Sequence, residues 1–452
     1  MILEQFATYV ERQNDEPLDP VVLHAAKRAL IDWFAALMPG TRTAPALQLY
    51  RAHAAELNHG KSSLPVKQAT AFPATAAWIN GSASHAVEFD DIFRDAIYHP
   101  GCPTIAAALA VAEDVDASGD ALLRAIIAGY EVSTRIGAAI QPAHYRYFHT
   151  TGTVGCFGAA GAAALLYSPG DATVALHSMA TAATFASGLQ QAFRSDAMTK
   201  ALHAGHAAWV GVTAAQGAAA GITGVADILE GGAGFGAALC DSPDWGTVTK
   251  GLGDVFNITR ITQKNHGCCG HTFAAIDALL DLRKQHRIAA QEIGRIRVDT
   301  YAQALDVAGI RNPTSAFEAR FSLPYVLSHA TVYGSVRLGA FEPERLADPQ
   351  VRALLGAVEL NADPELTAAF PKQRAARVTV TLKDGRTFDT FAPYRRGDPE
   401  APLDDEELNG KFMELASPVI GSSNAMALLT NLWRIESLAV ADLQLAKLGF
   451  RG

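Results

Sequence analysis

The fold is organised around residues 85–113, which read HAVEFDDIFRDAIYHPGCPTIAAALAVAE. Two adjacent carboxylates, Asp90 and Asp91, lie between two imidazoles, His85 and His99, and a Pro-Gly pair follows the second imidazole. A Pro-Gly pair marks a turn, and the Ala-, Leu- and Val-rich run that comes next is typical of a buried helix. We therefore expect the acids and His99 on a loop between two apolar helices, where a rigid scaffold presents reactive side chains.

A purely structural role fits this stretch equally well when it is taken alone. An Asp-Asp pair ahead of a turn often caps a helix, and a lone histidine is more often packed or solvated than catalytic. Residues elsewhere in the chain decide between the two interpretations.

The composition is that of a large globular protein. The chain has 452 residues, a length that is enough for two or three domains with a large core. Its residues are 49% hydrophobic and 18% charged, which is typical of a globular protein. The net charge of -9 is mild, and no block of Lys and Arg is present. We therefore expect neither nucleic acid nor a membrane surface as a partner.

The N-terminus and the cysteines both indicate the cytoplasm. Residues 1–6, MILEQF, lack a basic region and a long apolar run, so we expect no signal peptide. The apolar segment 207–222 is interrupted by glycines and Gln216, which favours a core helix over a membrane span. Five cysteines without a C-x-x-C spacing indicate a reducing compartment and argue against a zinc or iron–sulfur site.

Helical periodicity dominates residues 1–255, which we expect to form a large all-α domain. Residues 20–37 place apolar side chains at the spacing of one buried helix face. Many small residues allow such helices to pack closely in one bundle. The same helical pattern recurs at 69–80, 105–115, 121–139, 158–166, 172–187 and 200–221.

Residues 256–400 are expected to form a smaller α+β domain. Residues 257–262 and 296–301 alternate like strands, with a helix over 272–286 between them. Residues 377–391 predict a hairpin, because Asp-Gly at 384–385 suits its turn.

Helical periodicity returns in residues 401–452, which we expect to pack against the first helices again. The predicted fold class is therefore mainly α, with a large helical domain and a smaller α+β domain inserted into it.

Two further segments of the helical domain place polar side chains in apolar surroundings. Arg146 and His149 precede a Gly/Ala-rich helix whose N-terminal N–H groups suit an anion, although an ordinary N-cap turn is the alternative. Lys200 and His203 are three residues apart, so they share one face of a helix. A desolvated lysine can either hold a carboxylate or act as a base.

The smaller domain contributes Lys264 and His271, which flank the adjacent cysteines Cys268 and Cys269. Adjacent cysteines seldom both ligate one ion and the tetrahedral spacing is absent, so we expect no metal here. Tyr325 places a phenol on an apolar segment, for which a core tyrosine is the structural alternative.

The chain resembles the MmgE/PrpD family, which contains 2-methylcitrate dehydratase, cis-aconitate decarboxylase and iminodisuccinate epimerase. The resemblance covers nearly the whole chain and implies a large helical domain with a smaller α+β lid, usually in a homodimer. It rests on His85-x-x-x-Phe89-Asp90-Asp91 with His99-Pro100, Phe148-His149-Thr-Thr-Gly152, Lys200-x-x-His203-Ala-Gly205, Gly221-x-Thr-Gly224, Leu229-Glu-Gly, and Lys264 followed by Cys269-x-x-Thr272.

The resemblance also implies a set of site residues, three of which come from the smaller domain, so that a substrate would bridge the domains. This chain has Thr272-Phe273 where family members often have Thr-His, which leaves the role of the nearby imidazole open. The catalytic candidates are Asp90, Asp91, His99, Lys200, Lys264 and Tyr325, and the substrate-binding candidates are Arg146, His149, His203 and His271.

The implied function is that of a cofactor-independent lyase, a dehydratase or decarboxylase of a small di- or tricarboxylate such as 2-methylcitrate or cis-aconitate. Epimerisation of an iminodisuccinate-like compound is the alternative. All these reactions build negative charge on a carbon next to a carboxylate, which lysines and histidines can neutralise while they move protons. Asp91 or Asp90 would orient His99 as the base or acid, and Lys200 would hold a carboxylate.

Two other classes stay open at this point. Asp90, Asp91 and Asp95 resemble the Asp-rich magnesium motif of prenyl-transfer enzymes, although an α+β domain does not fit that class. The other class is a non-catalytic binding protein that retains the scaffold.

Overall fold

The structure is a computed structural model that describes residues 1–193, 197–370 and 372–449. The chain divides into two units, of which the first comprises Met1–Thr262 with Asp404–Gly452 and the second comprises Gln263–Leu403. The sequence pattern places these boundaries at 255/256 and 400/401. The fold class is mainly α, as predicted.

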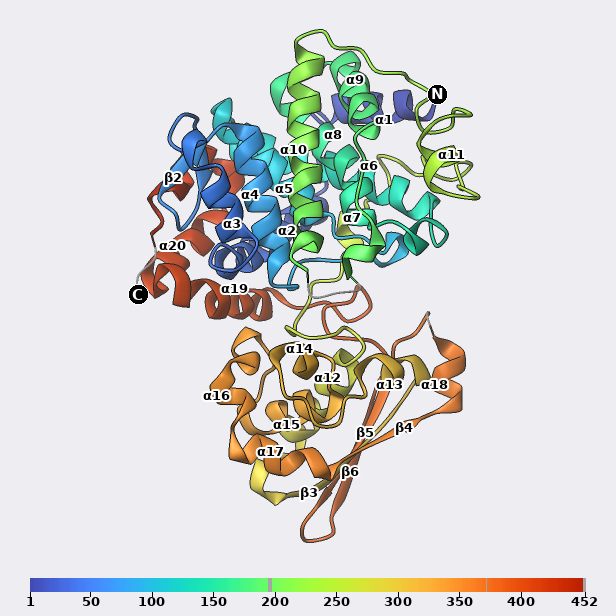
Figure 1. The fold of residues 1–452 in the computed structure, drawn as a ribbon, viewed down its shortest axis with the longest axis vertical. Helices are drawn as coiled ribbons and strands as arrows, with labels where there is room; N and C mark the ends of the chain where they lie inside the picture. Colours follow the sequence, from blue (N-terminus) through green and yellow to red (C-terminus); the bar gives the residue numbers. More distant parts are fainter. Residues whose placement is uncertain (194–196, 371, 450–452) are drawn as a thin grey trace. The chain divides into compact units, whose positions relative to one another are not determined.

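The first unit is a helical bundle in which α10 (Thr199–Ala219) packs against α4 (Pro73–Ala86) and α8 (Gly155–Tyr167) (Figure 1). Glycines permit this close packing, since a Cβ atom at Gly205 would lie 2.1 Å from Oγ of Ser82 on α4. α5 (Gly101–Asp114) lies against α4 and α8 and is almost entirely buried, as its Ala-rich sequence predicts.

The other helices of this unit surround that centre. α6 (Gly119–Ala139) packs on α8, and α19 (Asp405–Ile420) of the C-terminal segment packs on α2 (Pro20–Gly40), so the last helices belong to the bundle. The remaining bounds are α1 (Ile2–Arg12), α3 (Ala46–Ala52), α7 (Thr150–Thr153), α9 (Ala172–Ala183), α11 (Phe235–Leu239) and α20 (Ser422–Trp433).

Two predicted elements of this part of the chain are wrong or incomplete. Residues 257–262 do not form a strand but a 3-10 helix, Asn257–Arg260, because polar groups of α6 bind it: Ile258 N–H donates to Glu131. Residues 69–80 are only partly helical, since β2 (Ala69–Ala71) pairs antiparallel with β1 (Ser62–Leu64) and α4 begins afterwards at a proline.

The second unit contains a four-stranded sheet in the order β4-β3-β5-β6. β3 (Ile293–Thr300) runs parallel to β4 (Val358–Ala362) and antiparallel to β5 (Ala376–Leu382). β5 and β6 (Thr387–Ala392) form the predicted hairpin, with Gly385 in the left-handed region at φ 91°.

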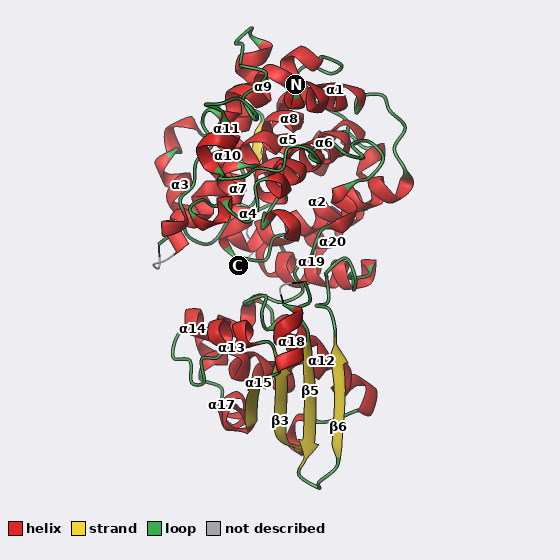
Figure 2. Cartoon of the chain, turned by 90° about the vertical axis from the view of Figure 1, so that its right-hand side faces the viewer, coloured by secondary structure: helices red, strands yellow, loops and turns green. Residues whose placement is uncertain are grey.

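Helices pack against this sheet (Figure 2). α12 (Phe273–His286) contacts β5 and β6, and α15 (Leu323–Tyr333) contacts α12 and β4. Buried residues alternate with less buried ones along β5, as expected when one face of a sheet is covered. The other helices are α13 (Ala302–Ala308), α14 (Ala316–Arg320), α16 (Pro343–Leu346), α17 (Pro349–Leu354) and α18 (Pro364–Ala369).

No helix among residues 1–193, 197–370 and 372–449 combines the length and apolar character needed to cross a membrane.

Candidate active site

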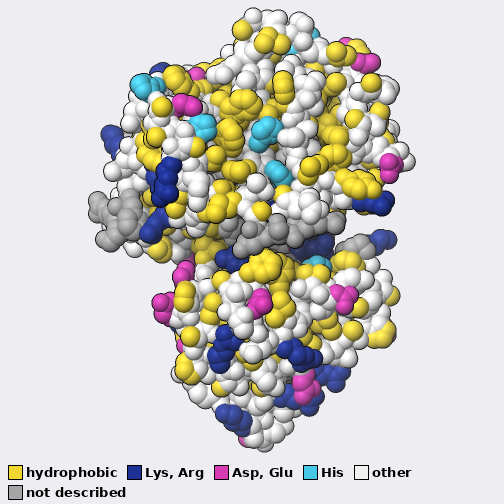
Figure 3. Space-filling model, in the orientation of Figure 1, with side chains coloured by type: hydrophobic (Ala, Val, Ile, Leu, Met, Phe, Trp, Pro, Cys, Tyr) yellow, Lys and Arg dark blue, Asp and Glu magenta, His cyan; other side chains and the backbone are white. Residues whose placement is uncertain are grey.

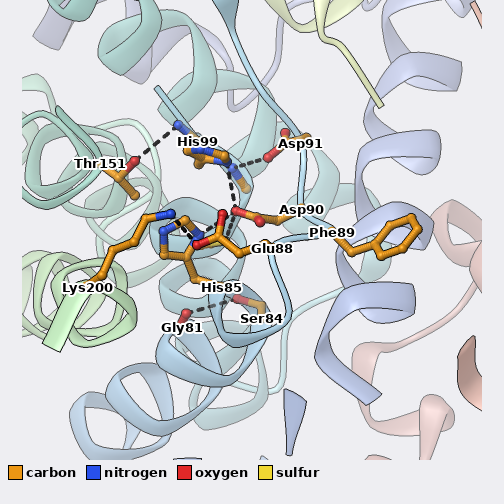
Figure 4. Close-up of polar contacts among 12 residues, drawn as sticks. Gly81, Ser84, His85, Glu88, Phe89, Asp90, Asp91, His99, Thr151 and Lys200 are labelled. Carbon is orange, nitrogen blue, oxygen red and sulfur yellow. Dashed lines mark hydrogen bonds and ion pairs between the residues drawn. The ribbon is translucent and has the colours of Figure 1, made fainter. Parts of the chain in front are cut away.

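The acids and His99 lie on the segment that connects α4 to α5, as predicted. α4 ends at Ala86 and α5 begins at Gly101, so both helices hold the ends of this segment. In Figure 4 the side chains of Glu88, Asp90 and His99 lie close together beside His85 at the end of α4, whereas the ring of Phe89 points away from them.

Asp90 is the carboxylate that contacts the imidazoles. Its Oδ2 atom lies 2.7 Å from Nδ1 of His85 and 3.0 Å from Nδ1 of His99. The thiol of Cys102 on α5 donates to the same oxygen at 2.9 Å. Asp90 is 1% exposed, and a buried carboxylate needs such donors because an unpaired charge in the interior is costly.

This arrangement orients both imidazoles. A carboxylate next to Nδ1 favours the tautomer with a proton on Nδ1. The Nε2 atom of His85 is buried, whereas the side chain of His99 is 15% exposed, so His99 is the imidazole that a bound molecule can reach. The backbone N–H of His99 donates to Oγ1 of Thr151 at 3.3 Å and adds a second restraint. The Asp90 carboxylate and the His99 imidazole are therefore held against each other by contacts on both residues.

Asp91 has a different role from its neighbour. Its carboxylate accepts hydrogen bonds from the hydroxyl of Tyr130 at 2.8 Å and from the backbone N–H of Gly101 at 3.0 Å. Burial raises the pKa of Asp91 to about 7, although the Tyr130 hydrogen bond opposes the shift. Asp91 thus accepts the first backbone N–H of α5, which is the helix-capping role that the sequence allowed for this acid pair. Asp90 is the carboxylate in contact with His99.

A second pair of imidazoles lies beside the first. His149, at the N-cap of α7, and His203, on α10, bring their Nδ1 atoms to 3.1 Å from each other. The ring of His149 also stacks on that of His85, with 5.6 Å between the ring centroids.

Burial lowers the pKa of both His149 and His203, the latter to about 4, and the nearby cations act in the same direction. Both imidazoles are therefore neutral at pH 7, so one ring donates its N–H and the other accepts. The sequence motifs predicted both residues, and the structure brings them together with His85.

Lys200 enters the same cluster from the first turn of α10 and forms an ion pair with Glu88. Burial disfavours the ammonium group, but the carboxylate of Glu88 outweighs this effect, so the pKa of Lys200 is raised. Glu88 adopts φ 57°, a left-handed conformation that is unusual for a residue with a side chain. Glu88 was not among the predicted site residues, although it lies inside the motif that contains Asp90.

Arg146 is not brought to this cluster by any contact found in the described segments. Its guanidinium lies on the surface, 5.0 Å from the centre of the Tyr147 ring. Its predicted role in substrate binding stays a prediction.

The other predicted residues belong to the second unit. Lys264 is buried, and Nδ1 of His271 lies 2.7 Å from the hydroxyl of Tyr301. Burial and the neighbouring Arg374 lower the pKa of His271 to about 4, so its imidazole is neutral at pH 7. Tyr325 lies in the hydrophobic core of this unit, and its hydroxyl donates to the carbonyl of Ala340. Catalytic or binding roles for Lys264, His271 and Tyr325 stay predictions.

Comparison with known proteins agrees with the motifs of this site. Residues 4–248 match the MmgE/PrpD N-terminal domain, and residues 266–434 match the MmgE/PrpD C-terminal domain. The chain belongs to the MmgE/PrpD family. The family expected from the sequence motifs is thereby confirmed.

Its relatives in this family include named decarboxylases. Human cis-aconitate decarboxylase is 28% identical over 456 residues, covering 97% of this chain and 92% of the human protein. The cis-aconitate decarboxylase-like protein oryM of Aspergillus oryzae is 28% identical over 458 residues, covering 95% and 92%. Mouse cis-aconitate decarboxylase is 27% identical over 456 residues, covering 97% and 91%.

One group in the described part of this MmgE/PrpD chain could hold a metal ion: His85, Asp90 and His99 offer ligand atoms within 4.8 Å of one another. The 2.7 Å contact of His85 with Asp90 is a hydrogen bond, and the 3.0 Å contact of His99 with the same carboxylate is an ion-pair contact. The three acids of the Asp-rich motif bind different partners: Asp90 contacts the imidazoles, Asp91 accepts from Tyr130, and Asp95 pairs with Arg260.

Proposed function

We propose that this MmgE/PrpD protein is a lyase that decarboxylates or dehydrates a small di- or tricarboxylate, with cis-aconitate as the first substrate to test. The observation that carries the proposal is the partly buried cluster in which the Asp90–His99 pair lies with the neutral His149–His203 pair and Lys200. The names of the human, mouse and Aspergillus relatives support the choice of substrate.

The cluster suits a reaction that develops charge on carbon. In a decarboxylation the C–C bond to one carboxylate breaks, CO₂ leaves, and the electron pair stays on the carbon until a proton is added. In this step His99 acts as the imidazolium: held through Nδ1 by Asp90, it gives its Nε2 proton to the carbon and is left as the neutral Nδ1–H tautomer, which solvent protonates again. Such general acid catalysis contributes about 10²- to 10⁴-fold.

Lys200 supplies the positive charge that this reaction needs. We propose that a substrate carboxylate takes the place of the Glu88 carboxylate on Lys200, so that the ammonium group stabilises the negative charge of the transition state. The neutral imidazoles of His149 and His203 offer one donor and one acceptor to the substrate's polar groups. No metal or organic cofactor takes part in this scheme.

Proton NMR in deuterated buffer tests the proposal with cis-aconitate, 2-methylcitrate and an iminodisuccinate-like dicarboxylate. Loss of CO₂ or water from one of the first two supports the lyase. Deuterium exchange at a carbon next to a carboxylate, without loss of either, supports an epimerase instead. Tight binding of one of these acids without any conversion supports a binding protein and contradicts the proposal.

We also propose a homodimer that forms through the first unit. On the face of that unit seen in Figure 3, hydrophobic side chains lie over the region of α10 and charged side chains lie mainly towards its margins. Phe185, Leu189 and Met198, which precede α10 in the chain, are more than half exposed. Exposed apolar side chains of this kind are typical of association surfaces.

The five cysteines support a location in a reducing compartment. All five lie within the described residues and are free thiols. We propose the cytoplasm, because disulfides are rare in proteins of that compartment.

A further inference from the structure

Next to the loop that carries Asp90, the first unit contains a buried ion pair that has no role in the proposed reaction. Lys411 on α19 and Asp32 on α2 are both 0% exposed, with 2.5 Å between Nζ and Oδ1. The second carboxylate oxygen of Asp32 is also buried and has no hydrogen-bond partner in the described part of the chain.

A buried ion pair is a poor way to stabilise a helix contact. Both groups lose their hydration, and apolar side chains of similar volume often give equal or greater stability. α2 and α19 pack together through many apolar residues, so their contact does not depend on a charge. The other contacts of Lys411 therefore explain why a lysine occupies this buried position.

Lys411 forms a hydrogen bond with the backbone of the loop that carries Asp90. Its Nζ donates to the carbonyl oxygen of Phe89 at 3.0 Å and lies 4.8 Å from the centre of the Phe89 ring. That carbonyl belongs to the peptide group that joins Phe89 to Asp90. The Phe89 ring is fully buried and points away from the imidazoles, so the residue acts as an anchor on the far side of the loop (Figure 4).

The loop needs such an anchor, because it has no regular structure at this point and Glu88 adopts the left-handed φ of 57°. An unfavourable conformation persists only when the surroundings hold it. On the other side of Asp90, Tyr130 and the start of α5 hold Asp91. Asp90 thus lies between two restrained residues.

We propose that Lys411, held by Asp32, is a positioning residue for the Asp90–His99 pair. By fixing the peptide group that precedes Asp90, it sets the position of the Asp90 carboxylate and, through it, the orientation of the His99 imidazole. This inference rests on the proposed role of His99 as the acid–base group. It assigns a function to α19, whose Lys411 contacts a residue that lies 322 positions earlier in the chain.

The test replaces the pair by apolar groups of similar volume, Asp32→Leu with Lys411→Met. We expect this double variant to fold and to lose about 10- to 100-fold in kcat, because small displacements of a catalytic group are costly, while KM changes by less than about twofold. The ring nitrogen resonances of His99, assigned by their absence from the variant His99→Gln, should shift or broaden. Leu415→Ala, on the same helix, is the control that lowers stability but keeps kcat and the resonance.

A folded double variant with wild-type kcat and an unshifted His99 resonance overturns the proposal. If the apolar pair prevents folding, Asp32→Asn with Lys411→Gln provides a neutral polar pair to which the same criteria apply. If the wild type converts none of the polycarboxylates, the proposed function has failed, but the resonance comparison still decides the role of Lys411.

Discussion

At the scale of single residues, the proposed chemistry depends on His99. Replacing it by Gln removes the group that exchanges a proton, so we expect kcat to fall by about 10²- to 10⁴-fold. The melting temperature should stay near that of the wild type, because the imidazole is partly exposed and forms little of the core. His24→Gln, in a surface contact with Asp405, is the matched control. If His99→Gln retains wild-type turnover, the group that moves the proton is to be sought at Lys200 or Lys264.

Lys200 and Glu88 are expected to change substrate binding. Lys200→Met removes the cation that holds a carboxylate, so KM should rise by about 10-fold or more, with a further fall in kcat if the lysine stabilises the transition state. Glu88→Gln removes the carboxylate that competes for Lys200 and should lower KM. Steady-state kinetics with the identified substrate decides, and a raised KM in Glu88→Gln would contradict the exchange of carboxylates.

The group formed by His85, Asp90 and His99 makes metal removal a direct test. Since the proposed scheme moves protons between imidazoles and carbon, activity should survive exhaustive treatment with EDTA. The enzyme is assayed before and after chelation, together with its metal content by elemental analysis. Loss of activity that returns on adding zinc or magnesium would contradict the scheme.

At the scale of elements, α6 binds the backbone of residues 250–258 through two of its side chains, Glu131 and Arg135. We expect one of them, Glu131, to make the stability of the protein depend on pH. Glu131 on α6 is 0% exposed and accepts the N–H of Ile258, while Arg135 on the same helix donates to the carbonyls of Lys250, Gly251 and Val255. Burial raises the pKa of Glu131 from 4.5 to about 7.

A raised carboxyl pKa means that folding takes up a proton between these two values. The stabilisation of the folded state by the protonated Glu131 carboxyl is therefore fully present below pH 4.5 and is lost as the pH rises through 7. We expect the free energy of unfolding to fall by about 3 kcal/mol across this window through this one group. Denaturant unfolding at several pH values should show a flatter dependence for Glu131→Gln. Identical slopes for wild type and variant would contradict the shift.

At the scale of the whole molecule, the proposed homodimer predicts a mass near twice the 47.8 kDa of one chain. Light scattering coupled to gel filtration at micromolar concentration checks it. Leu189→Asp, at an exposed apolar position of the first unit, should weaken the association without unfolding the chain. A single species of monomer mass for the wild type would contradict the dimer.

The sequence alone predicted the mainly α class, the family, the segment between α4 and α5 and the β5–β6 hairpin. Each of these depends on local signals: helical periodicity, ordered motifs, or an Asp-Gly turn with Gly385 at positive φ. The same local signals failed at 257–262, where the alternation of a strand gives way to a 3-10 helix held by Glu131.

Only the tertiary structure decided which of the adjacent acids serves the imidazoles. Asp90 and Asp91 are equivalent in sequence, but packing of α4 and α5 turns one to His99 and the other to Tyr130. The contacts of Lys200 with Glu88 and of Lys411 with Phe89 join residues 112 and 322 positions apart. No sequence periodicity reaches that far, because such pairs form only when the helices that carry them pack together.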